Sequence, residues 1–163
     1  MDRDNVIKVG MADFNAVSCP DVLTTLGLGS CIGLCLYDSF TKVAGMIHIM
    51  LPYSSNGIGE YNPAKYADTG IPLLIDKMEK MGAIKLRLTA KMAGGAQMFG
   101  FSSDNDIIQI GKKNIAATKE LLEKLNIRII AEDTGGSCGR TIEFSANDGS
   151  LLIKTIGKGT QVI

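Results

Sequence analysis

The chain has 163 residues, 17 basic and 17 acidic side chains, and 45% hydrophobic residues. This length favours one domain, so we expect a single domain over residues 1–163. Zero formal charge argues against a dedicated nucleic-acid binder. No apolar run approaches the roughly 20 residues of a membrane helix. Since the sequence starts without the pattern of a signal peptide, we expect a cytoplasmic protein with reduced cysteines.

Four extended segments are predicted before the first helix, at residues 6–9, 22–26, 31–37 and 43–51. The last two are almost wholly apolar, which is typical of strands buried on both faces. Asn62 followed by Pro63 predicts a helix start. The helix then extends over 64–81, and Pro72 inside it predicts a kink or a division into two helices.

The second half of the chain alternates further strands with one more helix. Strands are predicted at residues 84–92, 127–131, 141–144 and 151–156, and a helix at 112–125. Residues 147–149 read Asn-Asp-Gly, a hairpin signal between the last two strands. Roughly seven or eight strands with two or three helices are too many strands for a doubly wound fold. We therefore expect an α/β protein with two packed sheets and helices outside them.

A glycine-rich segment precedes the first long apolar strand. Gly27, Gly29 and Gly33 are spaced G-x-G-x-x-x-G, one residue too long for a dinucleotide fingerprint, and a strand follows instead of a helix. Tight glycines let backbone amides approach a ligand, and a nucleophile on a sharp turn is a recurrent device in acyl transfer. Cys31 lies at such a junction. The alternative, a core cysteine beside a bulge, stays open.

His48 is the only histidine, so it alone could be a histidine base for Cys31. A short turn between segments 31–37 and 43–51 predicts an antiparallel hairpin in which residue 31 pairs with about residue 48. A slip by one residue would turn His48 to the other face. A thiol with a pKa near ~8.5 needs an imidazole within reach to react at neutral pH. A satisfied core histidine is the other interpretation.

The remaining candidate residues have simpler interpretations. We expect Cys35 in the core, Cys19 exposed in a turn, and Cys138 on a glycine-rich loop as a rival nucleophile without a base. No C-x-x-C pair exists, so no metal site is expected. Three carboxylates are expected in turns or on the surface: Asp38, Asp68 and Asp133. Met98 and Phe99 could form an exposed patch that binds a partner.

Several motifs together resemble the CheD family, the chemoreceptor glutamine deamidases of bacterial chemotaxis. They are TLGLGSC at 25–31, GMIHIMLP at 45–52, KYADT at 65–69, AGGA at 93–96 and AEDTGG at 131–136. The resemblance implies a layered α/β/β/α sandwich of mixed sheets with flanking helices. It further implies a cysteine-hydrolase-like fold similar to the catalytic domains of deamidating toxins, with no cofactor.

The resemblance also implies a triad in which Cys31 is the nucleophile, His48 the base and Thr25 the residue that orients the imidazole. Backbone amides near Gly29 and Ser30 are candidates to hold the oxyanion. Methyl-accepting chemoreceptors would be the substrates and a CheC-type phosphatase a partner, with no membrane insertion and a monomer when alone. Two alternatives stay open: a regulatory module that binds a receptor helix or the phosphatase without turnover, and a hydrolase of small amides.

Overall fold

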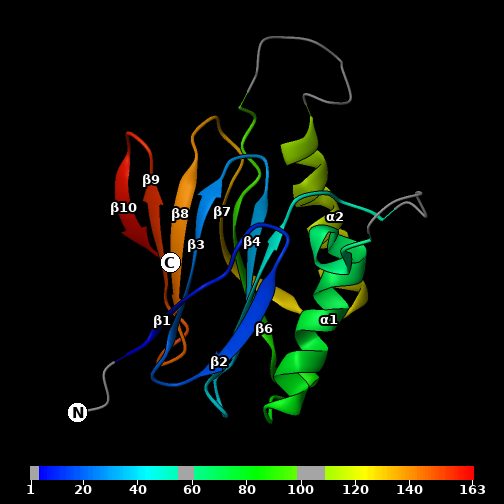
Figure 1. Ribbon diagram of the computed structural model, residues 1–163, viewed down its shortest axis with the longest axis vertical. Coiled ribbons are helices and arrows are strands. Elements are labelled where there is room, and N and C mark those ends of the chain that lie inside the picture. The colour runs from blue at the N-terminus through cyan, green and yellow to red at the C-terminus, as the bar shows by residue number, and fades with distance from the viewer. Residues whose placement is uncertain (1–3, 55–60, 99–108) are drawn as a thin grey trace.

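A computed structural model describes residues 4–54, 61–98 and 109–163, which contain ten strands and two α-helices (Figure 1). The strands are β1 (Val6–Lys8), β2 (Phe14–Ser18), β3 (Val22–Leu28), β4 (Ile32–Asp38), β5 (Val43–Ile49), β6 (Thr89–Gly94), β7 (Arg128–Thr134), β8 (Arg140–Ser145), β9 (Leu151–Thr155) and β10 (Gly159–Val162). The helices are α1 (Ala67–Lys80) and α2 (Ile110–Lys124), with short 3₁₀ turns η1 (Pro63–Lys65) and η2 (Lys85–Arg87). Within these ranges, neither α-helix is long and apolar enough to cross a lipid bilayer.

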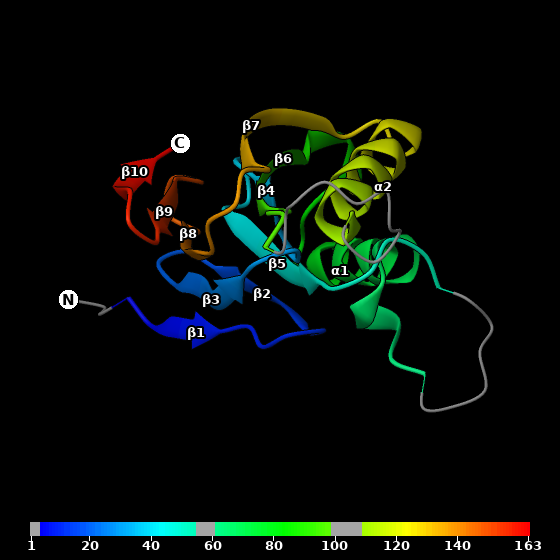
Figure 2. The ribbon, with the colours of Figure 1, turned by 90° about the horizontal axis from the view of Figure 1, so that it is seen from above.

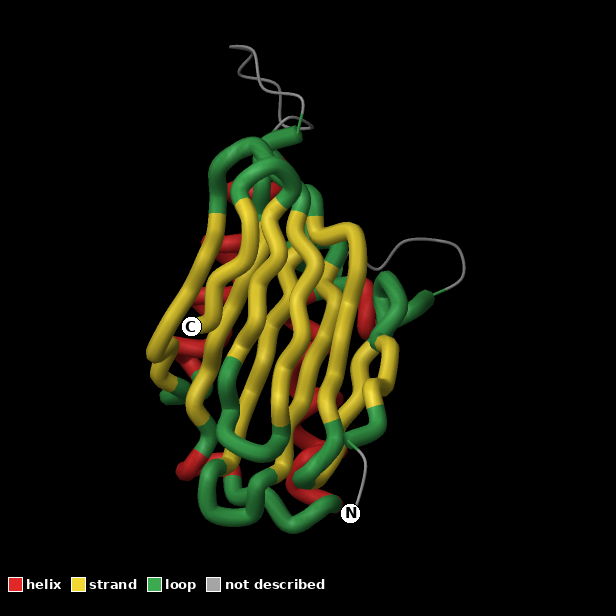
Figure 3. Tube along the Cα trace, turned by 90° about the vertical axis from the view of Figure 1, so that its left-hand side faces the viewer, coloured by secondary structure: helices red, strands yellow, loops and turns green. Residues whose placement is uncertain are grey.

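The strands form two stacked mixed sheets, as expected. One sheet has the order β1-β3-β8-β9-β10 and the other β2-β5-β4-β6-β7, each with a single parallel pair at one edge. Both helices pack on the second sheet (Figure 2). Figure 3 looks onto the first sheet, whose outer face no helix of the described ranges covers. The expected fourth layer is therefore wrong, and the described fold is α/β/β.

In the uncovered sheet, the burial of side chains alternates as in a sheet with one solvent-exposed face. Along β8 buried and half-buried residues alternate, so only one side chain in two contacts the core. In the second sheet, every residue of β4 and β5 is buried, as their apolar composition predicts. On β4, Ile32, Leu34 and Leu36 pack toward the helices, whereas Cys35 and Tyr37 face the other sheet.

The hairpin of β4 and β5 has a register two residues away from the predicted one. His48 pairs with Gly33, not with residue 31. The turn is longer than expected: Asp38 pairs with Val43, and the Lys42 amide donates to the Asp38 carbonyl at 2.8 Å. Because the shift is an even number of residues, it keeps His48 on the face that carries Cys31.

Two other local predictions need correction. The helix continues through Pro72 without division, since the missing amide affects only one bond near its first turn. The predicted strand at 84–92 begins only at Thr89, after the turn η2. The short strands β2 and β10 were not predicted at all.

Asp38 borders the β4–β5 turn, as expected, but its side chain is not on the surface and binds the segment that contains η2. Its side chain is fully buried and accepts a bidentate pair of hydrogen bonds from the Arg87 guanidinium. It also accepts a hydrogen bond from the Ile84 amide at 3.0 Å. The Phe40 amide also donates to it at 3.0 Å. Burial alone would raise the pKa of Asp38, but these bonds together hold it below the ordinary carboxyl range.

Candidate active site

The loop between β3 and β4 carries the predicted nucleophile at the upper end of the molecule in Figure 1. A bulge interrupts the pairing of β3 with β8 between Thr25 and Leu28, and Gly27 there has a φ of +71°. That left-handed conformation favours glycine. The bulge therefore redirects the chain just before the loop that carries Cys31.

His48 lies in the layer between the two sheets, where its side chain is fully buried. Its Nδ1 atom is 2.7 Å from the hydroxyl of Thr25 on the facing sheet. That hydroxyl donates its single hydrogen to the Val9 carbonyl at 2.7 Å. The hydroxyl oxygen must then accept from Nδ1, so Nδ1 carries the ring proton. The lone pair is left on Nε2, which has no hydrogen-bond partner among the described residues.

Cys31 precedes β4 on the same face as His48. It belongs to the cluster of buried residues between the sheets and is 9% exposed. Since His48 pairs with Gly33, Cys31 is its diagonal neighbour, and such pairs lie roughly 7–8 Å apart. Among the described residues, no hydrogen bond joins the Cys31 thiol to Nε2. The resting site thus holds the two groups in one layer without a hydrogen bond between them.

The electrostatics of this layer favour an uncharged pair. Burial raises the pKa of the Cys31 thiol and lowers the pKa of His48. At neutral pH the resting groups are therefore a thiol and an imidazole. A nucleophilic role for such a thiol requires that a general base remove its proton during attack.

The hydrogen bonds of the loop backbone distinguish the two candidate oxyanion donors, the amides of Gly29 and Ser30. The Gly29 amide donates to the Gly27 carbonyl at 3.1 Å, so it is already engaged. The amides of Ser30 and Cys31 have no partner within the described ranges. The geometry therefore favours Ser30 over Gly29 and adds the amide of Cys31 itself.

On the opposite side of the same loop, the carbonyls are all bound. The Gly29 carbonyl accepts from the Ala96 amide at 2.8 Å, and that of Cys31 from the Gly95 amide at 2.9 Å. The Ser30 carbonyl accepts from Nδ2 of Asn114 on α2 at 2.9 Å. We did not single out Asn114 from the sequence, although a polar residue among the apolar positions of a helix is a detectable signal.

The other predicted residues lie around this centre. Met98 is 46% exposed and covers Gly29, where an added Cβ would lie 3.2 Å from Met98 Cγ. Phe99 lies outside the described residues. Cys35 is fully buried in the core as predicted, and burial raises its pKa. Cys19 is exposed, and its thiol is 3.5 Å from the Asn147 side chain.

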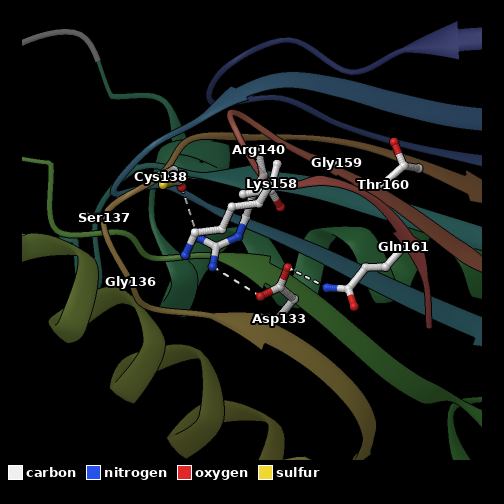
Figure 4. A pocket seen from close by; sticks show the side chains of 10 residues that line it. Asp133, Gly136, Ser137, Cys138, Arg140, Lys158, Gly159, Thr160 and Gln161 are labelled. Carbon is white, nitrogen blue, oxygen red and sulfur yellow. Dashed lines mark hydrogen bonds and ion pairs between the residues drawn. The ribbon is translucent and has the colours of Figure 1, made fainter.

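Cys138 borders a different feature, a pocket of about 230 Å³ shown in Figure 4. Arg140 crosses this pocket and donates to Asp133 at 3.2 Å and to the Gly135 carbonyl at 2.9 Å. Gln161 donates to the other Asp133 oxygen at 2.9 Å. Two of the charged groups in the pocket, Arg140 and Asp133, are thus already paired with each other. The one histidine of the chain is bound to Thr25, so Cys138 has no imidazole beside it.

Comparisons with known proteins place the chain in a family. The family model of CheD, described as CheD chemotactic sensory transduction, matches residues 50–155. A probable chemoreceptor glutamine deamidase CheD from Caldanaerobacter subterraneus subsp. tengcongensis is 56% identical over 161 residues, 99% of each chain. A chemoreceptor glutamine deamidase CheD from Halalkalibacterium halodurans is 54% identical, covering 98% of this chain and 99% of its own. The family match starts after His48, but these relatives align with nearly the whole chain. The chain belongs to the CheD family.

Proposed function

We propose that this chain is a chemoreceptor glutamine deamidase, a single domain over residues 1–163 that acts in the cytoplasm. Cys31 is its nucleophile, His48 its general base and Thr25 the residue that orients the imidazole. The observation that carries the proposal is the unpartnered Nε2 lone pair of His48, fixed by Thr25 in the buried layer that contains Cys31. The names of the full-length relatives supply the substrate class.

The first half of the reaction forms a thioester. The Cys31 sulfur attacks the side-chain carbonyl carbon of a receptor glutamine while Nε2 of His48 takes the thiol proton. The carbonyl oxygen becomes an oxyanion, which the amides of Ser30 and Cys31 can hold. Such donors contribute about 3 kcal/mol each to stabilisation of the transition state. The carbon–nitrogen bond then breaks, and protonated His48 gives its proton to the departing ammonia.

The second half restores the enzyme. His48 takes a proton from water as the oxygen attacks the thioester, and the carbon–sulfur bond breaks. The products are a glutamate side chain and the free Cys31 thiol, which recovers the proton from His48. One water is consumed, and the carboxylic acid first formed gives its proton to the released ammonia, so the net products are a glutamate side chain and ammonium.

Thr25 makes this a weaker triad than one with a carboxylate. Its hydroxyl fixes the tautomer of His48 but carries no charge to stabilise the imidazolium that forms during the reaction. Burial of His48 opposes the imidazolium further. We therefore expect a slow enzyme, which suits a modification made once on each receptor site.

The direct test is the mass of a receptor cytoplasmic fragment after incubation with the protein. Deamidation replaces NH₂ by OH and adds about one dalton at each glutamine, at ordinary isotope masses. Cys31→Ala is the control and should add nothing. Binding of the fragment without any change in mass would refute turnover and leave the regulatory binding module. Rapid ammonia release from free glutamine would favour the small-amide hydrolase.

A CheC-type phosphatase is proposed as a partner that binds at the same surface, with the protein a monomer when alone. The exposed Met98 beside Gly29 supports an open rim that a protein segment can reach. Added phosphatase should raise the apparent KM for the receptor fragment. A lower kcat at constant KM, or simultaneous binding of both proteins, would place the partner on a separate surface. Sedimentation of the isolated protein tests the monomer.

A further inference from the structure

Asn114 joins the two segments that carry the proposed nucleophile and base. It lies on α2, and its side chain is fully buried. Its Nδ2 group donates to the Ser30 carbonyl at 2.9 Å and to the Met50 carbonyl at 3.0 Å. Ser30 immediately precedes Cys31, and Met50 follows His48 by two residues. One amide group therefore connects the nucleophile loop to the end of β5.

The bond to Ser30 fixes a particular peptide plane. A trans peptide is planar, with its C=O and N–H directed oppositely. The Ser30 carbonyl and the Cys31 amide belong to the same peptide. When Asn114 holds that carbonyl toward α2, the Cys31 amide must point away from the helix. This is one of the two loop amides that have no partner among the described residues and are free to bind an oxyanion.

Neighbouring anchors do not replace this contact. The carbonyls of Gly29 and Cys31 are held by backbone amides, so Asn114 provides the one side-chain contact among the three. Without it, the Ser30–Cys31 peptide can rotate between two fixed neighbours. Rotation would turn the carbonyl oxygen toward the site in place of the N–H and repel the negative charge that develops there.

The helix itself is adapted to this contact. Gly111 lies one turn before Asn114, and a Cβ there would be 2.5 Å from the Ala96 carbonyl oxygen. Only glycine permits this close approach, which brings a short side chain within reach of the loop. The Oδ1 atom of Asn114 is buried and has no hydrogen-bond partner among the described residues, which is destabilising for a polar group. Packing alone would favour an apolar residue here.

We infer that Asn114 is a positioning residue of the deamidase: it orients the Ser30–Cys31 peptide so that the Cys31 amide donates to the oxyanion. It acts through the backbone and does not touch the substrate. The inference rests on the proposed active site.

The test compares reactions that form an oxyanion with one that does not. In Asn114→Leu, kcat for the receptor fragment should fall about 10–100-fold with KM changed less than about twofold, because a donor is misdirected. Binding of a peptide aldehyde, whose carbonyl adds to Cys31, should weaken about tenfold for the same reason. Alkylation of Cys31 by iodoacetamide displaces iodide without an oxyanion, so its rate should stay within about twofold of wild type.

Thr118→Val is the matched control, since Thr118 lies one turn further along α2, is fully buried and has no partner for its hydroxyl among the described residues. It should leave kcat, aldehyde binding and the alkylation rate unchanged. Asn114→Ala leaves room for a water that donates to both carbonyls, so its loss should be smaller than that of the leucine variant. The alanine variant also serves if Asn114→Leu fails to fold.

Three outcomes would overturn the inference. Unchanged deamidation in folded Asn114 variants would remove any role in the reaction. Parallel losses of alkylation and deamidation would mean that Asn114 positions the thiol or only stabilises the fold. Equal losses with Thr118→Val would mean general disturbance of α2. The aldehyde and alkylation measurements need no receptor turnover, so a wild-type protein inactive on receptor would refute the proposed function separately.

Discussion

The two ends of the β4–β5 hairpin differ in whether their buried polar side chains have hydrogen-bond partners. At the turn, Asp38 accepts bonds from Arg87 and from the amides of Ile84 and Phe40, so its carboxylate is well satisfied. At the open end, His48 is equally buried, but its Nε2 has no partner among the described residues. A buried polar group without a partner is destabilising, whereas a fully bonded one holds chain segments together. This is the difference expected between a structural anchor and the general base proposed for this site.

The largest difference is expected between the two buried cysteines of this hairpin. Cys31→Ala should abolish deamidation of a receptor fragment, because the other thiol on this face, Cys35, is fully buried and out of reach of a substrate. Cys35→Ala, on the same face but fully buried, should keep activity within about threefold and lose about 1 kcal/mol of stability. Mass spectrometry of the fragment measures both. Full activity of the Cys31 variant would exclude it as the nucleophile.

Removal of the base comes next. His48→Asn keeps a polar side chain but transfers no proton, so kcat should fall by roughly 10²–10⁴. Alkylation of Cys31 by iodoacetamide should slow as well, since the thiol loses its proton acceptor. Equal alkylation rates in the variant and the wild type would show that His48 does not activate Cys31.

The anchor at the other end should affect stability instead of chemistry. Asp38→Asn removes the charge that binds Arg87, and the free energy of unfolding should fall by about 2–3 kcal/mol. The folded variant should keep the wild-type kcat at 25 °C. Urea unfolding and activity assays together test this contrast. A variant with normal stability but low activity would reverse the roles assigned to the two ends.

Thr25 should have a smaller effect than His48. Thr25→Val keeps the shape of the side chain but removes the hydroxyl that joins Nδ1 to the Val9 carbonyl. Turnover should fall about tenfold, because the imidazole stays in place with its tautomer unset. Thr25→Ser restores the hydroxyl and should recover most of the activity. A serine variant as slow as the valine variant would mean that the methyl group matters, not the hydroxyl.

The pH dependence should report the burial of His48. Because burial lowers its pKa, the acid limb of kcat/KM should have its midpoint below the ordinary value of about 6.5. Below about pH 6.5, His48 binds a proton in the unfolded chain but stays neutral in the folded protein. The free energy of unfolding should therefore decrease as the pH falls through this range. His48→Asn should flatten that slope in urea titrations. A midpoint above 6.5 would indicate a stabilised imidazolium.

Local patterns determined much of the fold and the choice of candidate residues. The apolar runs at 31–37 and 43–51 predicted two strands buried on both faces, and this is what the structure contains. The single histidine limited the choice of base before any geometry was known. Its placement on the face of Cys31 survived a register error because the error was even.

Other features depended on contacts between distant segments. Asp38 looked like a turn residue, and only the approach of Arg87, 49 residues later, made it a buried anchor. The hydrogen bond from the Thr25 hydroxyl to the Val9 carbonyl could not be predicted from the sequence, because every residue has a carbonyl. The same holds for the Ser30 and Met50 carbonyls bound by Asn114.

The sequence by itself therefore determined which strands are central and which side chains are candidates for the chemistry, because periodicity and residue type are local properties. The tertiary structure decided which nitrogen of His48 is available, which loop amides stay free and how many layers cover the sheets. Each of these depends on what a group meets across the fold. The role of a buried donor or acceptor depends on whether a segment distant in sequence supplies its hydrogen-bond partner.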